Sequence, residues 1–242
     1  MGIRHEVIPF IALSAGVGLV TALALRVFLS SWSLPAGVGA AVAALLSLYM
    51  LFFFRDPQRV PPADAVSIVA PADGRLESIK TLSAEDFQTL CLRSGLKPED
   101  LARFGSGEVV RFSIFLSLFN VHVNRSPMDG KSRFLGYFPG KRLFTFDEKS
   151  SEENQHNAIR IENDDTCCLL YQIVGPVCRR VVYWPSHEAS VSIRKGERIG
   201  MMKFGSRLDL YFPAGDITAL ATPGDKVRAG ETVIARMKGT EK

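Results

Sequence analysis

The sequence predicts a mainly β domain that follows an N-terminal pair of membrane-spanning helices. Two long apolar runs occupy residues 8–25 and 34–54, and neither contains a charged residue. From residue 66 onward, short β-type runs alternate with turn residues. An Arg-x-Gly-Glu-x-aliphatic pattern occurs twice, at residues 194–199 and 228–233, and this repeat favours a pseudo-symmetric barrel or sandwich.

Each apolar run is long enough to cross a membrane as a helix. A hydrocarbon core of roughly 30 Å requires about 20 residues at ~1.5 Å of rise per residue. The first run alone is also consistent with a signal peptide, because Arg4 precedes it and small residues follow. A second run so close behind favours a transmembrane hairpin over residues 1–54. Neither run has a polar face, which argues against two buried core helices.

The basic residues beside the two runs predict an orientation. Arg4, Arg55 and Arg59 flank the outer ends of the hairpin, whereas the short connection between the runs carries only Arg26. Positively charged flanks stay on the cytoplasmic side of a membrane. We therefore expect the protein in the inner (cytoplasmic) membrane, with everything after residue 55 in the cytoplasm.

The cysteines and the net charge limit the classes of ligand. Four cysteines, at positions 91, 167, 168 and 178, show no C-x-x-C spacing, so they indicate neither a zinc site nor a disulfide framework. Cys167 and Cys168 lie in an apolar run and are expected in the core. A net charge of +4 suits an anionic lipid surface and is too weak to indicate nucleic acid as a partner.

Residues 55–65 are rich in proline and predict a linker, and residues 66–242 form the main domain. Most of its segments are of β type, but residues 84–104 are expected to be helical. Ser83 is a suitable N-cap for the first helix, and Pro98 sits in the first turn of a second. Unpaired edge strands in such a domain make a homodimer a reasonable expectation.

The repeated Gly-Glu turns are typical of hammerhead barrels of the biotinyl or lipoyl type. This leaves open a membrane-tethered biotinyl or lipoyl carrier modified at Lys203, within "GMMKFG". The domain is much larger than a carrier needs, however, and "FNVHVNRSP" would have no role in one. A zinc peptidase is also disfavoured, because the four histidines form neither H-x-H nor H-E-x-x-H. A purely structural membrane protein is a further alternative, in which Ser206 could be replaced by alanine without effect.

Two stretches carry candidate polar side chains. Asp73 lies in "APADG", where an aspartate before glycine is usually a turn residue. His122 lies in "FNVHVNRSP" and is expected in a strand, with Asn120 and Asn124 on the same face. A hydrogen-bonded structural histidine is the alternative. Arg125 follows and could bind a carboxylate or phosphate with two hydrogen bonds.

A third stretch, "KFGSRLDLYFP" at residues 203–213, places a Gly-Ser step directly before a β-type run. Glycine leaves the carbonyl of residue 205 open to attack and tolerates a strained backbone. Ser206 is an internal nucleophile if a base activates it. His122 could be that base and Asp73 could orient it, in the manner of a catalytic triad. The alternative is an ordinary turn.

Taken together, these stretches resemble the phosphatidylserine decarboxylase family, of the short bacterial and archaeal type. The resemblance rests on "FFRDPQRVPP", "APADG", "FNVHVNRSPMDG", "SEENQHN", "GERIGMMKFGSRLDLYFP" and "GDKVRAGETV", which occur in family order between residues 52 and 233. Two departures stand out. The 84–104 segment resembles an insertion, and Gln155-His156 replaces the Glu-Arg that the family commonly shows, which puts substrate binding near His156 in doubt.

The resemblance implies self-cleavage between Gly205 and Ser206, which gives a β chain of residues 1–205 and an α chain of residues 206–242. Ser206 would become an N-terminal pyruvoyl cofactor that forms a Schiff base with phosphatidylserine, releases CO₂ and yields phosphatidylethanolamine. Asp73, His122 and Ser206 match the family's processing triad. Asn124 and Arg125 are expected to bind substrate, and no metal is expected. A different phospholipid with a serine head group, such as an ether-linked one, is the alternative substrate.

Overall fold

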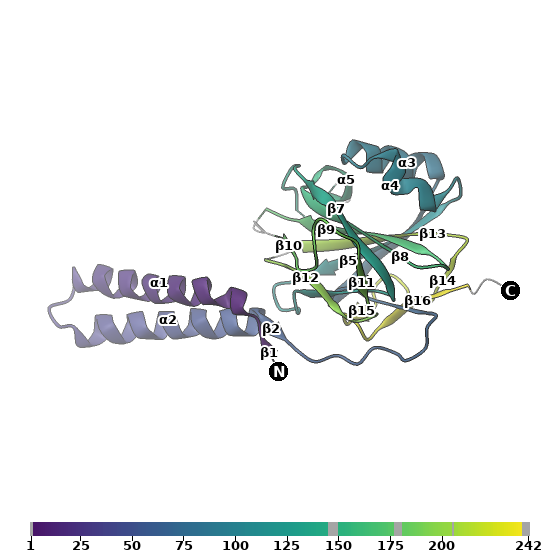
Figure 1. The fold of residues 1–242 in the computed structure, drawn as a ribbon. Helices are drawn as coiled ribbons and strands as arrows, with labels where there is room; N and C mark the ends of the chain where they lie inside the picture. Colours follow the sequence, from purple (N-terminus) through teal and green to yellow (C-terminus); the bar gives the residue numbers. More distant parts are fainter. Residues whose placement is uncertain (1, 145–149, 177–180, 205, 239–242) are drawn as a thin grey trace. The chain divides into compact units, whose positions relative to one another are not determined.

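The computed structural model describes residues 2–144, 150–176, 181–204 and 206–238. The chain divides into two compact units, residues 1–58 and 59–242. The first is a helical hairpin and the second is built mainly from strands (Figure 1). The boundary between the units falls inside the stretch that the sequence predicts as a linker.

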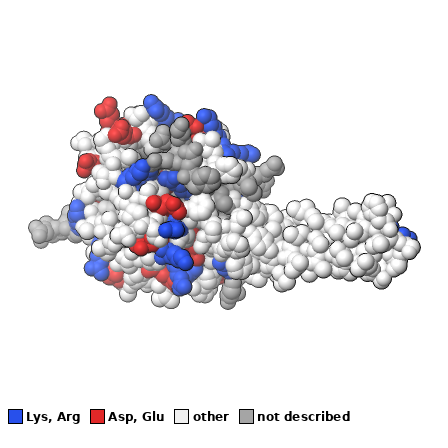
Figure 2. All heavy atoms as spheres, turned by 180° about the vertical axis from the view of Figure 1, so that it is seen from behind, with Lys and Arg blue, Asp and Glu red and all other residues white. Residues whose placement is uncertain are grey.

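The hairpin consists of α1 (Ile8–Arg26) and α2 (Ser33–Phe53), preceded by the 3₁₀ turn η1 (His5–Val7). Strands β1 (Gly2–Ile3) and β2 (Arg55–Asp56) pair antiparallel and join its two ends. Both helices are long and apolar enough to cross a membrane, as the sequence predicts. Figure 2 shows the hairpin surface almost free of charged side chains on the face in view, whereas both signs of charge occur on the β unit.

The two helices of the hairpin pack closely at a pair of glycines, Gly18 and Gly39. A Cβ atom added at Gly18 would lie 2.5 Å from the carbonyl oxygen of Gly39 and 2.7 Å from Cβ of Ala43. A Cβ added at Gly39 would meet the backbone of Gly18 in the same way. Small residues at such a crossing let two helices pack backbone to backbone.

We expect Gly18→Leu to separate the helices, because overpacking a close contact costs about 1–3 kcal/mol. Gly16→Leu is the matched control, since no atom lies within 4 Å of a Cβ added there. Cysteines introduced at Ile3 and Arg55, which face each other across β1 and β2, would report pairing of the hairpin ends by disulfide yield. Equal yields in the two leucine variants would contradict this packing.

The described residues of the second unit form three sheets. The largest has eight strands, in the order β11 (Val191–Ile193), β7 (Gly130–Phe138), β8 (His156–Glu162), β9 (Cys167–Val174), β13 (Ser206–Pro213), β5 (Val109–Leu116), β4 (Gly74–Leu82) and β15 (Lys226–Val227). Two smaller sheets have the orders β10 (Val181–Tyr183), β12 (Arg198–Met202), β6 (Val123–Arg125) and β14 (Ile217–Ala219), β16 (Val233–Met237), β3 (Ser67–Val69). All these pairs are antiparallel. The prediction of a mainly β domain is confirmed, and a hammerhead barrel remains a prediction.

The 84–104 segment is helical, as the sequence predicts. It forms α3 (Ala84–Arg93), α4 (Pro98–Leu101) and the 3₁₀ turn η2 (Ala102–Phe104), and α5 (Ser150–Glu153) is a further short helix. The hydroxyl of Ser83 accepts a hydrogen bond from the backbone N–H of Asp86, which is the expected N-cap. Figure 1 shows α3 and α4 covering one side of the strands.

Two hydrophobic cores lie on the two faces of the eight-stranded sheet. Alternation along β13 places Leu208, Leu210 and Phe212 in the first core and Tyr211 in the second. The second core packs the apolar side of α3 and α4 against the sheet. Cys167 and Cys168 are fully buried, as predicted, and burial raises the pKa of the Cys167 thiol to about 12. Cys178 lies outside the described residues.

An internal duplication explains the repeated Gly-Glu turns. The stretches Pro-x-Asp-Gly at 71–74 and 127–130 accompany Arg-x-Gly-Glu at 228–231 and 194–197, respectively. Asp73 accepts a hydrogen bond from Ala229 N (2.8 Å), and Asp129 accepts one from Lys195 N (2.9 Å). Each aspartate therefore holds the turn of its own repeat.

The backbones of the two repeats are also related. Gly196 and Gly230 have φ of +75° and +77°, values that favour glycine. Val69 N donates to Pro127 O and Arg125 N donates to Pro71 O, so the two halves exchange equivalent hydrogen bonds. Pseudo-symmetry, which the sequence predicts from one repeated motif, thus extends over a second motif that sequence reasoning missed.

Candidate active site

Ser206 is the first residue of β13, a central strand of the eight-stranded sheet. It faces Leu116 on β5 and Val174 on β9. Its side chain is fully buried, and its Oγ has no hydrogen-bond partner within the described part of the chain. A buried hydroxyl without a partner is costly in a structural role and is therefore a candidate for chemistry.

The turn before Ser206 is strained. Phe204 has φ of +67°, the one positive value of a non-glycine residue in the described chain. For a bulky side chain this conformation costs of order 1–3 kcal/mol, and such outliers cluster at active sites. Gly205 lies outside the described residues. The bond expected to be cleaved, between residues 205 and 206, is therefore preceded by the strained Phe204 and followed by the buried side chain of Ser206.

His122 lies directly before β6, rather than inside a strand as the sequence suggests. The strand begins at Val123, and Asn120 belongs to the preceding turn. The Nδ1 atom of His122 lies 2.9 Å from the carbonyl oxygen of Asn120, so a backbone group orients the ring. The carbonyl of His122 accepts a hydrogen bond from Met202 N (3.1 Å). This contact ties the histidine to the strand that leads into the strained turn.

Asp73 has different partners from those expected of a triad aspartate. Its carboxylate accepts hydrogen bonds from Arg59 Nη2 (2.9 Å) and from Ala229 N, whereas Nδ1 of His122 faces Asn120 O. Asp73 nevertheless shares a cavity of about 570 Å³ with Ser117 and Asn120. That cavity lies beside the end of β5 that pairs with Ser206. The roles predicted for Asp73, His122 and Ser206 remain predictions.

Arg59 is a residue that sequence reasoning assigned only to the membrane flank. Its guanidinium bridges the Asp73 and Glu231 carboxylates, at 2.9 Å and 2.7 Å, and its side chain is only 10% exposed. Removing one partner of such a poorly solvated ion pair is destabilising, because it leaves the other charge buried and unpaired. The Pro-x-Asp-Gly repeat is a further sequence signal for the turn at Asp73, but it does not mark Arg59 as the partner of that aspartate.

The two predicted substrate-binding residues are both buried. Arg125 donates from Nη1 to the carbonyl of Gly196 (2.9 Å) and packs beside Gly230, so it holds the two repeats together. Asn124 accepts a hydrogen bond from Gln172 Nε2 (2.8 Å), and its own Nδ2 is buried without a partner among the described residues. Substrate binding by either residue stays a prediction.

His156 lies on the other face of the sheet from Ser206. It pairs with Ile173, the neighbour of Val174, so its side chain points away from the serine. Its ring stacks on Phe138 and Tyr171, and burial lowers the pKa of the imidazole. The departure at His156 therefore alters the second core, whereas Gln155 lies nearer the serine, because its carbonyl accepts a hydrogen bond from the backbone N–H of Val174 (3.1 Å), the strand partner of Ser206.

Comparison with known proteins identifies the family. A family model described as phosphatidylserine decarboxylase matches residues 46–235. The phosphatidylserine decarboxylase proenzyme of Pelobacter propionicus is 37% identical over 236 residues, which is 97% of this chain and 96% of the relative. The proenzyme of Prosthecochloris aestuarii is 40% identical over 218 residues (89% and 91%), and that of Symbiobacterium thermophilum is 35% identical over 222 residues (91% and 92%).

These matches cover both the hairpin and the β unit of the described chain. The protein belongs to the phosphatidylserine decarboxylase family. The carrier alternative loses its support, because the stretch that matches the decarboxylase family, residues 46–235, includes Lys203. Among the described residues, no cluster of histidine, cysteine or acidic side chains could hold a metal ion.

Proposed function

We propose that the protein decarboxylates phosphatidylserine to phosphatidylethanolamine, after cleaving itself between residues 205 and 206. The observation that carries the proposal is the strained Phe204 two residues before the buried Ser206, whose Oγ has no hydrogen-bond partner among the described residues. The "proenzyme" in the names of the relatives supports a precursor that must be processed. The pyruvoyl group that results would supply an electron-accepting carbonyl for the substrate amine.

Processing needs only residues of this chain and one water molecule. The Oγ of Ser206 attacks the carbonyl carbon of Gly205, and the peptide C–N bond breaks as an ester forms, with the Oγ proton passing to the freed amine. A base then removes the Cα proton of Ser206 and the Gly205 carboxylate leaves. The resulting dehydroalanine takes up water and releases ammonia, which leaves a ketone at the new N-terminus.

His122 is the proposed base for these proton transfers. The carbonyl of His122 accepts a hydrogen bond from the backbone N–H of Met202, just before the strained turn, and the Asn120 carbonyl orients Nδ1 of its ring. Histidine exchanges protons near neutral pH, so the same side chain can later return a proton to the substrate carbon after CO₂ has left. Asp73, held by its ion pair with Arg59, places a negative charge in the cavity that Ser117 and Asn120 also line.

The surroundings of that cavity suit a phospholipid. Its lining carries both acidic and basic side chains, which match the mixed charges of a serine phospholipid head group; they are Asp73, Arg75, Glu77, Lys226 and Arg228. Beside it, Leu118 and Phe119 are 44% and 71% exposed. Exposed apolar side chains at the rim could contact acyl chains while the head group enters.

The apolar hairpin would hold the domain at the membrane where its substrate lies. We infer that both helices span the inner membrane, with the β unit on the cytoplasmic side, from their length and from the flanking arginines. Cleavage would leave α and β chains of one precursor within one fold. A homodimer and an ether-linked serine phospholipid as substrate both remain proposals.

The test combines a mass spectrum with a lipid assay on the purified full chain. We expect a fragment of about 4 kDa, at ~110 Da per residue, that is lighter than a serine-started peptide by one ammonia. Phosphatidylserine vesicles should yield phosphatidylethanolamine, and a carbonyl reagent such as phenylhydrazine should stop the reaction. Ether-linked phosphatidylserine tests the alternative substrate. An uncut, folded chain that nevertheless releases CO₂ would contradict the proposal.

A further inference from the structure

Three buried amide side chains form a hydrogen-bonded chain, here called the amide chain, between two sheets. Asn157 on β8 donates from Nδ2 to Oε1 of Gln172 on β9 (3.1 Å), and Gln172 donates from Nε2 to Oδ1 of Asn124 on β6 (2.8 Å). Asn157 and Gln172 are strand partners in the eight-stranded sheet, whereas Asn124 belongs to the sheet of β10, β12 and β6. None of the three residues is more than 3% exposed, so solvent does not satisfy their polar groups.

The amide chain ends on an N–H donor. Nδ2 of Asn124 is buried and has no hydrogen-bond partner within the described residues. Because Gln172 occupies Oδ1 of the same side chain, the Asn124 amide is held in one orientation, with Nδ2 at its far end. Gly200, the strand partner of Asn124, makes room for this contact, since a Cβ added there would lie 3.0 Å from Nε2 of Gln172. A buried donor of this kind is costly in a purely structural role and indicates a reacting group or a ligand.

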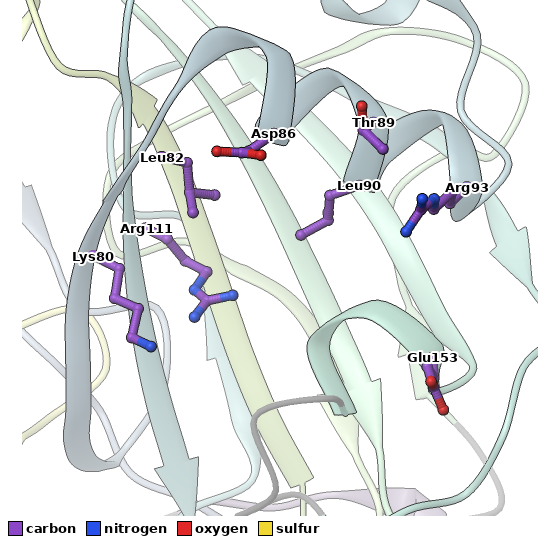
Figure 3. A pocket seen from close by; sticks show the side chains of 8 residues that line it. All are labelled: Lys80, Leu82, Asp86, Thr89, Leu90, Arg93, Arg111 and Glu153. Carbon is purple, nitrogen blue, oxygen red and sulfur yellow. The ribbon is translucent and has the colours of Figure 1, made fainter.

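The amide chain lies on the face of the eight-stranded sheet that Ser206 also faces. Alternation places Ser206 with Leu208 on the first core, and Leu208 pairs with Gln172. Gln172 and Ser206 are therefore diagonal neighbours across β9 and β13, a relation that places Cα atoms about 7–8 Å apart. The pocket of about 510 Å³ beside α3, which Arg111 helps to line, lies on the opposite face (Figure 3). Two buried atoms without a partner in the described chain, Oγ of Ser206 and Nδ2 of Asn124, thus belong to one layer.

The backbone around Asn124 leads to the same place. Asn124 follows His122, the proposed base, by two residues, and β6 pairs with β12. β12 ends at Met202, whose N–H donates to the His122 carbonyl, two residues before the strained Phe204. One short segment therefore carries both the proposed base and the amide donor, beside the strand that leads to Ser206.

We propose that Nδ2 of Asn124 stabilises the oxyanion that forms during self-cleavage, and that Gln172 and Asn157 are positioning residues for this amide. The inference rests on the proposed function. As Oγ of Ser206 bonds to the carbonyl carbon of residue 205, the π electron pair of that carbonyl moves to its oxygen. The pair returns when the C–N bond breaks and the amine takes the Oγ proton, which leaves an ester. An N–H that is already oriented toward the developing charge lowers the barrier without reorganising at the moment of reaction.

Two variants test the donor and its orientation separately. Asn124→Leu removes the donor, and we expect the small fragment to appear about 10²- to 10³-fold more slowly, the usual effect of losing one oxyanion donor. Gln172→Met keeps the donor but removes both hydrogen bonds that hold the amide chain, so we expect a smaller effect of roughly tenfold. If the amide chain were only structural, Gln172→Met would be at least as harmful as Asn124→Leu, because it breaks more bonds.

Tyr171→Phe is the matched control. Tyr171 precedes Gln172 on β9, is equally buried and points to the opposite face, where its hydroxyl lies 3.1 Å from that of Ser94. Its loss should lower the thermal midpoint, as Gln172→Met does, because each change breaks a buried hydrogen bond. The control should nevertheless be cut at the rate of the wild type.

The experiment follows full-length precursors made by cell-free translation into phosphatidylcholine nanodiscs, with and without hydroxylamine, which cleaves esters. We expect Asn124→Leu to stay uncut for longer in both conditions, because the ester itself forms slowly. Rapid cutting of that variant by hydroxylamine would place its defect after ester formation and would overturn the proposal. Cutting at the wild-type rate with loss of decarboxylation alone would also overturn it and would leave Asn124 as a substrate-binding residue. A wild type that stays uncut, like Ser206→Ala, would instead contradict the proposed function itself.

Discussion

A chain that carries Ser206→Ala is expected to remain a single polypeptide of about 26.6 kDa under conditions in which the wild type is completely cut. Alanine removes the only atom that the proposed mechanism uses as a nucleophile. It removes no hydrogen bond within the described chain, because Oγ of Ser206 has no partner there. We therefore expect full loss of the small fragment and of decarboxylation, with little loss of stability, as read by intact mass and thermal unfolding.

Ser132→Ala is a suitable control for this prediction. Ser132 is also fully buried, but its hydroxyl lies 2.7 Å from that of Tyr183, so alanine there breaks a hydrogen bond. The control should lose about 1–3 kcal/mol of unfolding free energy and still be cut. If the Ser206→Ala chain is cut as fast as the control, the serine is not the nucleophile and the step before β13 is an ordinary turn.

Asp73→Asn is expected to slow processing by on the order of 10²-fold or more, the scale of proton-transfer catalysis. The substitution keeps an oxygen that can accept from Ala229 N, but it removes the charge that Arg59 holds in the cavity that Asp73 and Asn120 both line. The rate of appearance of the small fragment, followed from a freshly made precursor, measures the effect.

Two variants separate this role from a structural one. Asp129→Asn changes the equivalent aspartate of the other repeat, which makes the same contact to a backbone N–H. Glu231→Gln removes the second carboxylate that Arg59 binds. Both chains should be processed at nearly the rate of the wild type. Processing of Asp73→Asn at that same rate would make Asp73 a turn residue and nothing more.

Local patterns were sufficient for much of the fold. Uncharged runs predicted the two apolar helices, and Ser83 with Pro98 predicted the helical 84–104 segment, because caps and periodicity act over a few residues. The start of β6 was missed, since Val121 and His122 have strand-like neighbours while the preceding turn is set by Asn120, which accepts hydrogen bonds from Ser117.

The contacts around the candidate site could not be predicted in the same way. Arg59 and Glu231 are far apart in sequence yet form one ion pair, and Asp73 joins them. Such pairs depend on the packing of sheets, which no local pattern encodes. The strain at Phe204 could not be predicted from the sequence either, because a positive φ is normally indicated only by a glycine.

The position of β13 affects how the cleaved enzyme can unfold and refold. The stretch 206–242 supplies β13 and β15 to the eight-stranded sheet and β14 and β16 to another, so the small chain is woven into the fold. The precursor folds as a single chain, because residues 205 and 206 are still joined by a peptide bond. Once it is cut, any unfolding releases two chains, and recovery becomes a bimolecular encounter whose rate depends on concentration. The cut enzyme can no longer refold as a single chain. Its lifetime would therefore depend on a slow rate of unfolding.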